Sequence, residues 1–262
     1  MPYETILFSQ EGAVATVALN RPEAMNAINL KLGEELVDCL ERCAEDASIR
    51  AVILTGKGRA FFAGADLRQV KENLNDAPNF LKQIIRYLHP AVSAIRRMPK
   101  PVICAVNGVA AGAGFSLVLT CDIVIAAESS RFTMAYVNIG LNPDGSSTFF
   151  LPRMVGLQRA SWLFLTGEFV DARGGQELGF INQVVKDEEL MRVTNALATK
   201  LAAGPTLAMG RAKALINQSL SESLETQMEN ETRAIAASAA TEDFQEGVSA
   251  FLDKRQPDYK AR

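Results

Sequence analysis

The sequence predicts an α/β fold with a mainly parallel sheet, and two observations carry this prediction. Short apolar runs rich in β-branched residues alternate with longer stretches of helical periodicity over residues 1–190. From Met191 onward the strand signal disappears, and the chain becomes rich in Ala, Leu, Glu and Met. We therefore expect a core of repeated ββα-like units at residues 1–190 and a helical region at residues 191–262.

The individual elements follow from hydrophobic periodicity and from the residues that flank it. The predicted strands are short and apolar, and they lie at residues 5–8, 14–19, 51–55, 102–106 and 123–126. The predicted helices carry apolar residues every three or four positions, and they lie at residues 29–46, 66–73, 80–97, 189–203, 206–218, 220–240 and 243–252. Asn29 and Asp66 stand where N-caps are expected.

Composition and charge argue against several function classes. Lys and Arg number 27 against 30 Asp and Glu, whereas nucleic-acid binders usually carry a basic excess. The N-terminus lacks the basic and apolar regions of a secretory leader, so we expect a cytoplasmic protein. No CxxC pair occurs and His89 is the only histidine, which leaves no metal-binding pattern. Reduced, buried thiols are expected at cysteines 39, 43, 104 and 121.

A charge-free segment runs from Pro101 to Cys121 and is long enough to cross a membrane. Three glycines, at positions 108, 112 and 114, make it a poor helix interior, and Asp122 follows at once. A buried strand, a tight turn and a buried helix fit the segment better.

Two turns rich in Gly and Ala, at residues 61–67 and 107–114, each lead into a predicted helix. Backbone N–H groups at two helix starts can converge on one anionic oxygen, although close helix packing also explains such turns. The dinucleotide-binding pattern fails, because Leu117 stands where its third glycine would be. The sequence also lacks a phosphate-binding loop with Gly-Lys-Ser/Thr, so redox cofactors and nucleotide hydrolysis are both disfavoured.

Taken together, five ordered motifs resemble those of the crotonase (enoyl-CoA hydratase/isomerase) family across essentially the whole chain. They are Leu19-Asn20-Arg21-Pro22-Glu23-Ala24-Met25-Asn26-Ala27, Ala63-Gly64-Ala65-Asp66-Leu67, Lys100 to Gly108, Cys121-Asp122-Ile123 and Glu246 to Arg255. The resemblance implies a spiral core of ββα units, a C-terminal helical region that mediates trimerisation, and often a hexamer. It implies a coenzyme A thioester as substrate, with no separate cofactor.

The resemblance also assigns roles to residues. Two backbone amides, those of Ala65 and Ala113, would form an oxyanion hole for the thioester. The residues expected to bind coenzyme A are Ala24, Met25, Asn26, Ala63, Gly64, Ala65, Asp66, Leu67, Phe251 and Lys254. The last two of these would reach the coenzyme A of a neighbouring subunit.

The sequence departs from the family's hydratases at both of their glutamates, which fall here on Ser116 and Tyr136. Addition of water to a double bond needs groups that deprotonate the water and protonate C2, and Ser and Tyr replace carboxylates poorly near neutral pH. Asp144 follows a few residues later, in the region where 3-enoyl-CoA isomerases and the ring epoxide isomerase of phenylacetate breakdown place an acidic residue. Pro143-Asp144-Gly145 is also a strong turn sequence.

These features predict a double-bond isomerase in which Asp144 moves a proton from C2 to C4 of a 3-enoyl-CoA. The alternatives are an enoyl-CoA hydratase, a dehalogenase-like reaction in which Asp144 attacks a ring, and a non-catalytic acyl-CoA-binding or RNA-binding relative. His89 matches no catalytic position of the family, and a structural or surface role is expected for it. Acyl length and the choice between trimer and hexamer stay open.

Overall fold

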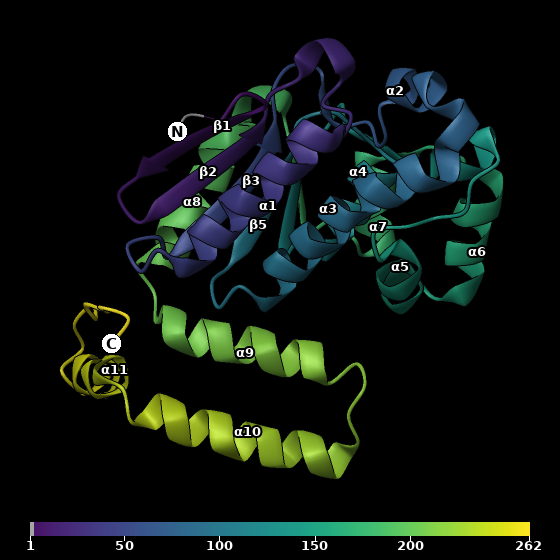
Figure 1. Ribbon diagram of the computed structural model, residues 1–262. Helices are drawn as coiled ribbons and strands as arrows, with labels where there is room; N and C mark the ends of the chain where they lie inside the picture. Colours follow the sequence, from purple (N-terminus) through teal and green to yellow (C-terminus); the bar gives the residue numbers. More distant parts are fainter. Residues whose placement is uncertain (1–2) are drawn as a thin grey trace.

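The computed structural model describes residues 3–262 and confirms the predicted α/β class (Figure 1). The strands are β1 (Ile6–Glu11), β2 (Val14–Leu19), β3 (Ala51–Gly56), β4 (Ala60–Phe62), β5 (Val102–Val106), β6 (Val109–Ala111), β7 (Ile123–Ala127), β8 (Arg131–Thr133), β9 (Val170–Asp171) and β10 (Gln183–Val185). The α-helices are α1 (Leu30–Glu45), α2 (Leu67–Glu72), α3 (Ala77–Arg97), α4 (Ala113–Thr120), α5 (Ser147–Val155), α6 (Leu157–Thr166), α7 (Ala172–Leu178), α8 (Leu190–Ala202), α9 (Thr206–Gln218), α10 (Leu224–Ala239) and α11 (Glu242–Leu252). The 3-10 helices are η1 (Pro22–Ala24), η2 (Leu74–Asp76), η3 (Ala135–Ile139) and η4 (Asp187–Glu189).

Three successive strand pairs are divided between two sheets. β3, β5 and β7 enter a six-stranded sheet of order β1-β2-β3-β5-β7-β10, and each following strand enters a four-stranded sheet of order β4-β6-β8-β9. All neighbours are parallel except β1 with β2 and β8 with β9. Each strand pair therefore advances one position along both sheets, which is the spiral of ββα units expected from the sequence.

The charge-free segment from Pro101 to Cys121 forms β5, β6 and the fully buried α4, as the glycine positions indicated. The two predicted caps are also confirmed. Asn29 Oδ1 accepts a hydrogen bond from Leu32 N at 2.8 Å, and Asp66 Oδ1 accepts one from Arg68 N at 3.2 Å. Among the described residues, no helix is both long and apolar enough to cross a membrane.

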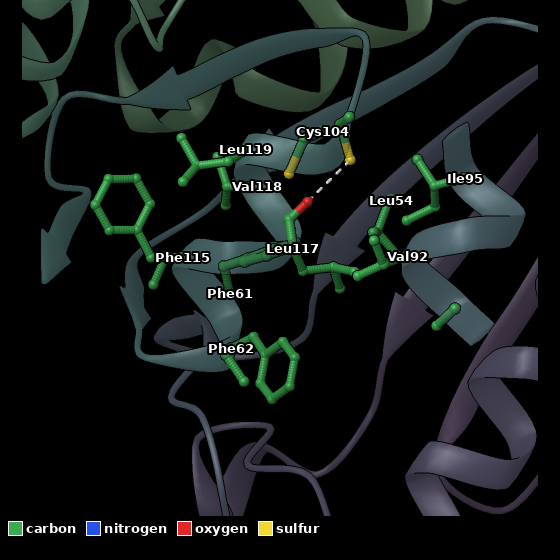
Figure 2. Close-up of a cluster of buried hydrophobic side chains, with 14 of the residues drawn as sticks. Leu54, Phe61, Phe62, Val92, Ile95, Cys104, Phe115, Leu117, Val118 and Leu119 are labelled. Carbon is green, nitrogen blue, oxygen red and sulfur yellow. Dashed lines mark hydrogen bonds between the residues drawn. The ribbon is translucent and has the colours of Figure 1, made fainter. Parts of the chain in front are cut away.

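The larger sheet is covered on both faces, so its strands alternate between two cores. Val52 and Leu54 of β3 pack into the larger core with α1, α3 and α4, whereas Ala51 and Ile53 pack against α8. Figure 2 shows part of the larger core, in which side chains of β4 lie among those of α3 and α4. The four cysteines are buried and unpaired.

The last helices differ in how they meet this core. α8 packs on the sheet, and α9 is the first of the helices that lie outside the sheet layers. α9 is tied to the core by an ion pair of 2.6 Å between Lys213 Nζ and Asp122 Oδ2. α10 lies beyond α9 and has no buried residue, and its Leu224, Met228 and Ile235 are exposed (Figure 1).

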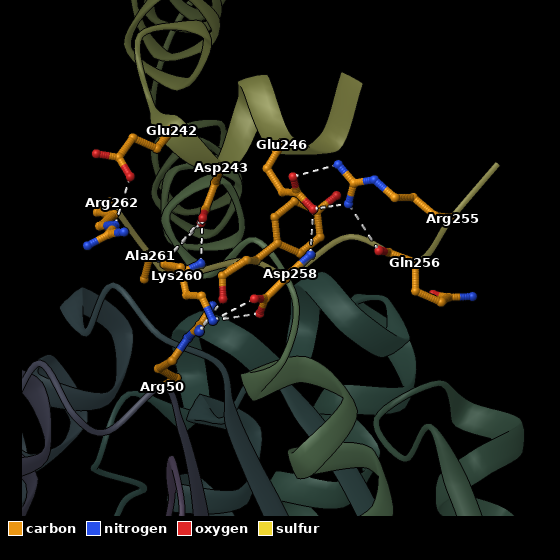
Figure 3. A network of polar contacts seen from close by, with 11 residues as sticks. Arg50, Glu242, Asp243, Glu246, Arg255, Gln256, Asp258, Lys260, Ala261 and Arg262 are labelled. Atoms are coloured by element: carbon orange, nitrogen blue, oxygen red, sulfur yellow. Dashed lines mark hydrogen bonds and ion pairs between the residues drawn. The ribbon is translucent and has the colours of Figure 1, made fainter. Parts of the chain in front are cut away.

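The polar tail after α11 folds back onto that helix (Figure 3). Asp243 accepts hydrogen bonds from the backbone of Lys260 and Ala261, while Glu246 pairs with Arg255 at 2.6 Å. Arg50, which follows α1, donates to the carbonyl of Tyr259 at 2.8 Å. These bonds fix α11 and the tail against the end of the core.

Candidate active site

A cavity of about 290 Å³ opens between the turn after β4, helix α3, the start of α4 and the segment from η3 to Asp144. Its wall is mostly apolar and is formed by Ile28, Ala63, Gly64, Ala65, Leu67, Leu81, Ile84, Ile85, Leu88, Gly112, Ala113, Ala135, Tyr136, Asn138, Ile139, Leu141, Asn142 and Asp144. Ala65, Ala113 and Asp144, which lie far apart in the sequence, are thus brought to one cavity. An apolar cleft with a few convergent polar groups is typical of a small-molecule site.

The first of the two predicted amides belongs to Ala65, in the turn between β4 and α2. Ile28 N donates to Gly64 O at 2.7 Å, and Asp66 N donates to Ile28 O at 3.0 Å, as in a parallel bridge. The N–H of the intervening Ala65 faces away from Ile28 and donates no backbone hydrogen bond within residues 3–262. Gly64 has a φ of +89°, a conformation that favours glycine, so the turn depends on this residue.

The second amide is that of Ala113, the first residue of α4. Its N–H is one of the donors at a helix start that have no partner in the helix, and the preceding Gly112 has a φ of +52°. A Cβ placed on Gly64 would lie 3.6 Å from Ala113 N, so the two turns are in contact. Both N–H groups and the positive end of the α4 dipole therefore lie at one end of the cavity.

Asn26 and Asp66, both expected to bind coenzyme A, are buried and bonded to other parts of the chain near the first turn. Asn26 is fully buried, and its side-chain amide donates to the carbonyls of Lys57, Ala60 and Phe61. Asp66 is buried and pairs with Arg21 at 2.9 Å. These bonds hold the segment of residues 21–26 against β4 and the turn that follows it.

The remaining predicted residues divide into two groups. Ala63, Gly64 and Leu67 line the cavity, while Ala24 and Met25 lie beside it, where Met25 O accepts a hydrogen bond from Ala63 N at 3.1 Å.

Phe251 and Lys254 lie at the end of α11, and neither borders the cavity within one chain. His89 is exposed on α3, in agreement with the structural or surface role expected for it.

Asp144 contributes the cavity's only carboxylate among the described lining residues. Its Oδ1 accepts a hydrogen bond of 2.6 Å from the hydroxyl of Tyr136. Its main-chain oxygen accepts bonds from Ser116 Oγ at 2.9 Å and Ser147 Oγ at 3.0 Å, which fix the turn. Burial raises the pKa of the Asp144 carboxyl, while the Tyr136 hydroxyl and the charge of His89 oppose that rise.

Ser116 and Tyr136 meet at Asp144, and this arrangement was not foreseen from the sequence. The two hydroxyl oxygens lie 3.2 Å apart, and both side chains are buried. Burial and the neighbouring carboxylate raise the pKa of the Tyr136 phenol, so it stays protonated and donates. The sequence marked both positions as lacking hydratase glutamates, but it gave no signal that they would contact Asp144.

Comparison with known proteins gives a consistent result over the full chain. A family model described as Enoyl-CoA hydratase/isomerase matches residues 9–262. A 1,2-epoxyphenylacetyl-CoA isomerase of Escherichia coli (strain K12) is 43% identical over 99% of both chains. A 2,3-dehydroadipyl-CoA hydratase of the same organism is 38% identical over 98% of this chain and 99% of its own. The crystal structure of an enoyl-CoA hydratase from Polaromonas sp. JS666 superposes with a TM-score of 0.94 and 36% identity, over 97% of this chain and 99% of that one.

The raised pKa of Asp144 predicts how its replacement changes stability with pH. A carboxyl whose pKa rises on folding binds more protons when folded, so the free energy of unfolding falls as pH rises from its ordinary pKa through the folded one. Asp144→Asn removes this titration. We expect the variant to melt at a higher temperature than the wild type at pH 8. Each kcal/mol gained in the free energy of unfolding corresponds to a rise in Tm of about 2–4 °C.

The measurement is a set of thermal melts of both proteins between pH 4 and pH 8. The difference in Tm is expected to shrink toward the acid end, where Asp144 of the wild type is protonated. Asp253→Asn, at an exposed position, serves as the control and should show no such trend. A wild type that melts higher than Asp144→Asn at pH 8 would contradict the prediction.

Proposed function

The chain belongs to the enoyl-CoA hydratase/isomerase family, and we propose that within it the chain is an acyl-CoA double-bond isomerase. The observation that carries the proposal is a cavity with two free backbone N–H groups and one carboxylate, that of Asp144. The two N–H groups suit a thioester oxygen that becomes negatively charged. One carboxylate suffices to move a proton between two carbons. Addition of water needs one group that deprotonates the water and another that protonates C2.

The proposed reaction starts from a 3-enoyl-CoA with its thioester oxygen between Ala65 N and Ala113 N. Asp144 removes a proton from C2, and the electrons of that C–H bond form a thioester enolate conjugated with the C3–C4 double bond. Asp144 then returns the same proton to C4, and the double bond is left between C2 and C3. The raised pKa of Asp144 supports this role, because a carrier must both accept the proton and release it.

Packing around position 116 weighs against the hydratase alternative. A Cβ on Gly145 would lie 2.8 Å from Ser116 Cβ, so the backbone of the Asp144 turn runs directly against this side chain. Ser116 is fully buried, and a glutamate would not fit in its place without displacing that turn. The hydratase remains the second candidate, because the 2,3-dehydroadipyl-CoA hydratase and the Polaromonas enoyl-CoA hydratase are similar over nearly the whole chain.

Coenzyme A enters the proposal as part of the substrate, and we assign no metal or redox cofactor. Its thioester end would lie against Ala63, Gly64 and Leu67, which line the cavity, and its nucleotide end toward Ala24 and Met25. The 43% identity to a 1,2-epoxyphenylacetyl-CoA isomerase supports a ring-type acyl group as a variant of the same proposal.

Replacing the proposed base tests the mechanism. Asp144→Asn keeps the size of the side chain and removes its proton-carrying ability, so turnover should fall by about a hundredfold to ten-thousandfold. Affinity for the acyl-CoA should change little, because the thioester and coenzyme A contacts come from other segments. The matched control is Asp187→Asn, at an exposed position, which should turn over normally.

Mass and chromatography of the products distinguish the two candidate reactions on panels of 3-enoyl-CoA and 2-enoyl-CoA esters. Isomerisation leaves the mass unchanged, whereas hydration adds one water. A product one water heavier, or normal turnover by Asp144→Asn, would overturn the proposed isomerase.

The part of the cavity wall formed by α3 predicts a preference for uncharged acyl groups. Leu81, Ile84, Ile85 and Leu88 of α3 line the cavity, and no Lys or Arg is among its described lining residues. A terminal carboxylate would enter this wall unpaired at a cost of several kcal/mol. We expect kcat/KM for an ω-carboxylated 3-enoyl-CoA to be lower by about a hundredfold or more than for the uncharged ester of equal length. Comparable kcat/KM values for the two esters would refute the assignment of this wall to the acyl group.

We further propose a homotrimer or hexamer joined through the helices after α8. Leu224, Met228 and Ile235 lie on one side of α10 and are 69%, 49% and 72% exposed, an apolar face that a second copy would cover. Ile235→Lys is expected to lower the mass measured by light scattering at micromolar concentration. Ala237→Lys adds the same charge on another side of α10 and should leave the mass unchanged. A monomeric wild type would contradict the proposal.

A further inference from the structure

Tyr136 stands where the family's hydratases carry a glutamate, yet its contacts give it a specific place in this site. The residue belongs to η3, is 8% exposed and lines the cavity. Its hydroxyl lies 2.6 Å from Asp144 Oδ1 and 3.2 Å from Ser116 Oγ. The ring lies over Gly112, where a Cβ would come within 3.6 Å of it. The phenol is therefore fixed between the start of α4 and the carboxylate.

The hydroxyl protons of Tyr136 and Ser116 determine how these two residues bond to Asp144. An ionised Asp144 can only accept, so the single hydroxyl proton of Tyr136 is donated to Oδ1. Ser116 also has one hydroxyl proton, and the main-chain oxygen of Asp144 at 2.9 Å is its nearest acceptor. When Asp144 takes up a proton, Tyr136 has a second acceptor in Ser116 Oγ. The network is thus satisfied in both protonation states of Asp144.

We propose that Tyr136 is a positioning residue, supported by Ser116, that holds Asp144 Oδ1 so that Oδ2 is the oxygen presented to the acyl group. The inference rests on the proposed function, in which Asp144 is the base. Oδ2 makes no hydrogen bond within residues 3–262, whereas Oδ1 is held by the phenol. The rotation of the carboxylate is therefore fixed before substrate arrives, as an efficient proton transfer requires.

The same hydrogen bond influences the charge of Asp144. Two titratable groups act on the carboxylate, Tyr136 of η3 through its hydrogen bond and the exposed His89 of α3 through its charge, and both favour its ionised form against the effect of burial. A hydrogen bond to a charged group stabilises it more than one to a neutral group does. Loss of the phenol hydroxyl must therefore raise the pKa of Asp144 further, and fewer molecules would carry an ionised base at a given pH.

Tyr136→Phe tests this inference through the dependence of kcat/KM on pH for a 3-enoyl-CoA. The rate rises with pH as Asp144 ionises, so a higher pKa moves this acid limb to higher pH. We expect a displacement of about one pH unit, equivalent to a loss on the order of tenfold in kcat/KM on the limb. A variant that had only lost packing would turn over more slowly with its acid limb unmoved.

Two further proteins make the test decisive. Tyr87→Phe removes a phenol hydroxyl from a half-buried position on α3 away from Asp144 and should leave the profile unchanged. Replacement of Tyr136 by 3-fluorotyrosine keeps the shape but makes the hydroxyl a stronger donor, so the acid limb should move to lower pH. This second variant also answers the question if Tyr136→Phe does not fold.

The outcomes separate this inference from the function on which it rests. Opposite displacements in Tyr136→Phe and in the fluorotyrosine protein support the positioning role. An acid limb that stays in place in both proteins overturns that role, while loss of activity in Asp144→Asn would still support Asp144 as the base. Normal turnover by Asp144→Asn overturns the proposed function and the inference together.

Discussion

The close approach of helix α4 to strand β4 is the constraint on which the site depends. A Cβ on Gly114 would lie 1.9 Å from Phe62 O, so no side chain fits between the helix and the strand. Because Gly114 has none, the first turn of α4 lies directly against the end of β4. Gly64 and Gly112 then turn the chain so that Ala65 N and Ala113 N are presented at the same cavity. The remaining contacts of the site secure this arrangement or add the carboxylate to it.

Asp144 places a carboxyl group in a mostly apolar cavity wall. Burial of an ionised carboxyl is unfavourable and raises its pKa, yet a proton carrier gains from that rise. The hydrogen bond from Tyr136 offsets part of the cost without neutralising the charge, since the phenol stays protonated. Stability is thus given up at the position where the proposed chemistry needs a reactive base, a trade-off common in enzyme sites.

Most of the fold could be predicted from the sequence because its signals are local. The strand at 102–106 and the helix at 206–218 have the predicted bounds, and the caps at Asn29 and Asp66 use their own side chains. The second sheet was not foreseen, because strands of two or three residues such as β8 and β9 show no periodicity. The packing of α8 on the sheet likewise depends on its tertiary neighbours and not on its own pattern.

The site was predictable to the extent that it rests on motif order. Ala65, Ala113 and Asp144, which the motifs singled out, line one cavity although they lie far apart in the sequence. The motif match did not reveal that the Asn26 side chain is buried and donates to three backbone carbonyls. The bond between Tyr136 and Asp144 depends on how the chain folds back between them, which their separation in sequence does not reveal.

Part of the site is formed by backbone groups and part by side chains. Sequence similarity over the whole chain therefore does not determine which reaction is catalysed. The two N–H donors come from the backbone, so any residue except proline supplies them, and isomerases and hydratases of one fold can share them. Relatives of both kinds accordingly lie at 43% and 38% identity. The side chains at the site are therefore what can set the reaction apart. Tyr136 and Asp144 line the cavity here, with Ser116 buried behind them, and the isomerase proposed above rests on the single carboxylate of this group.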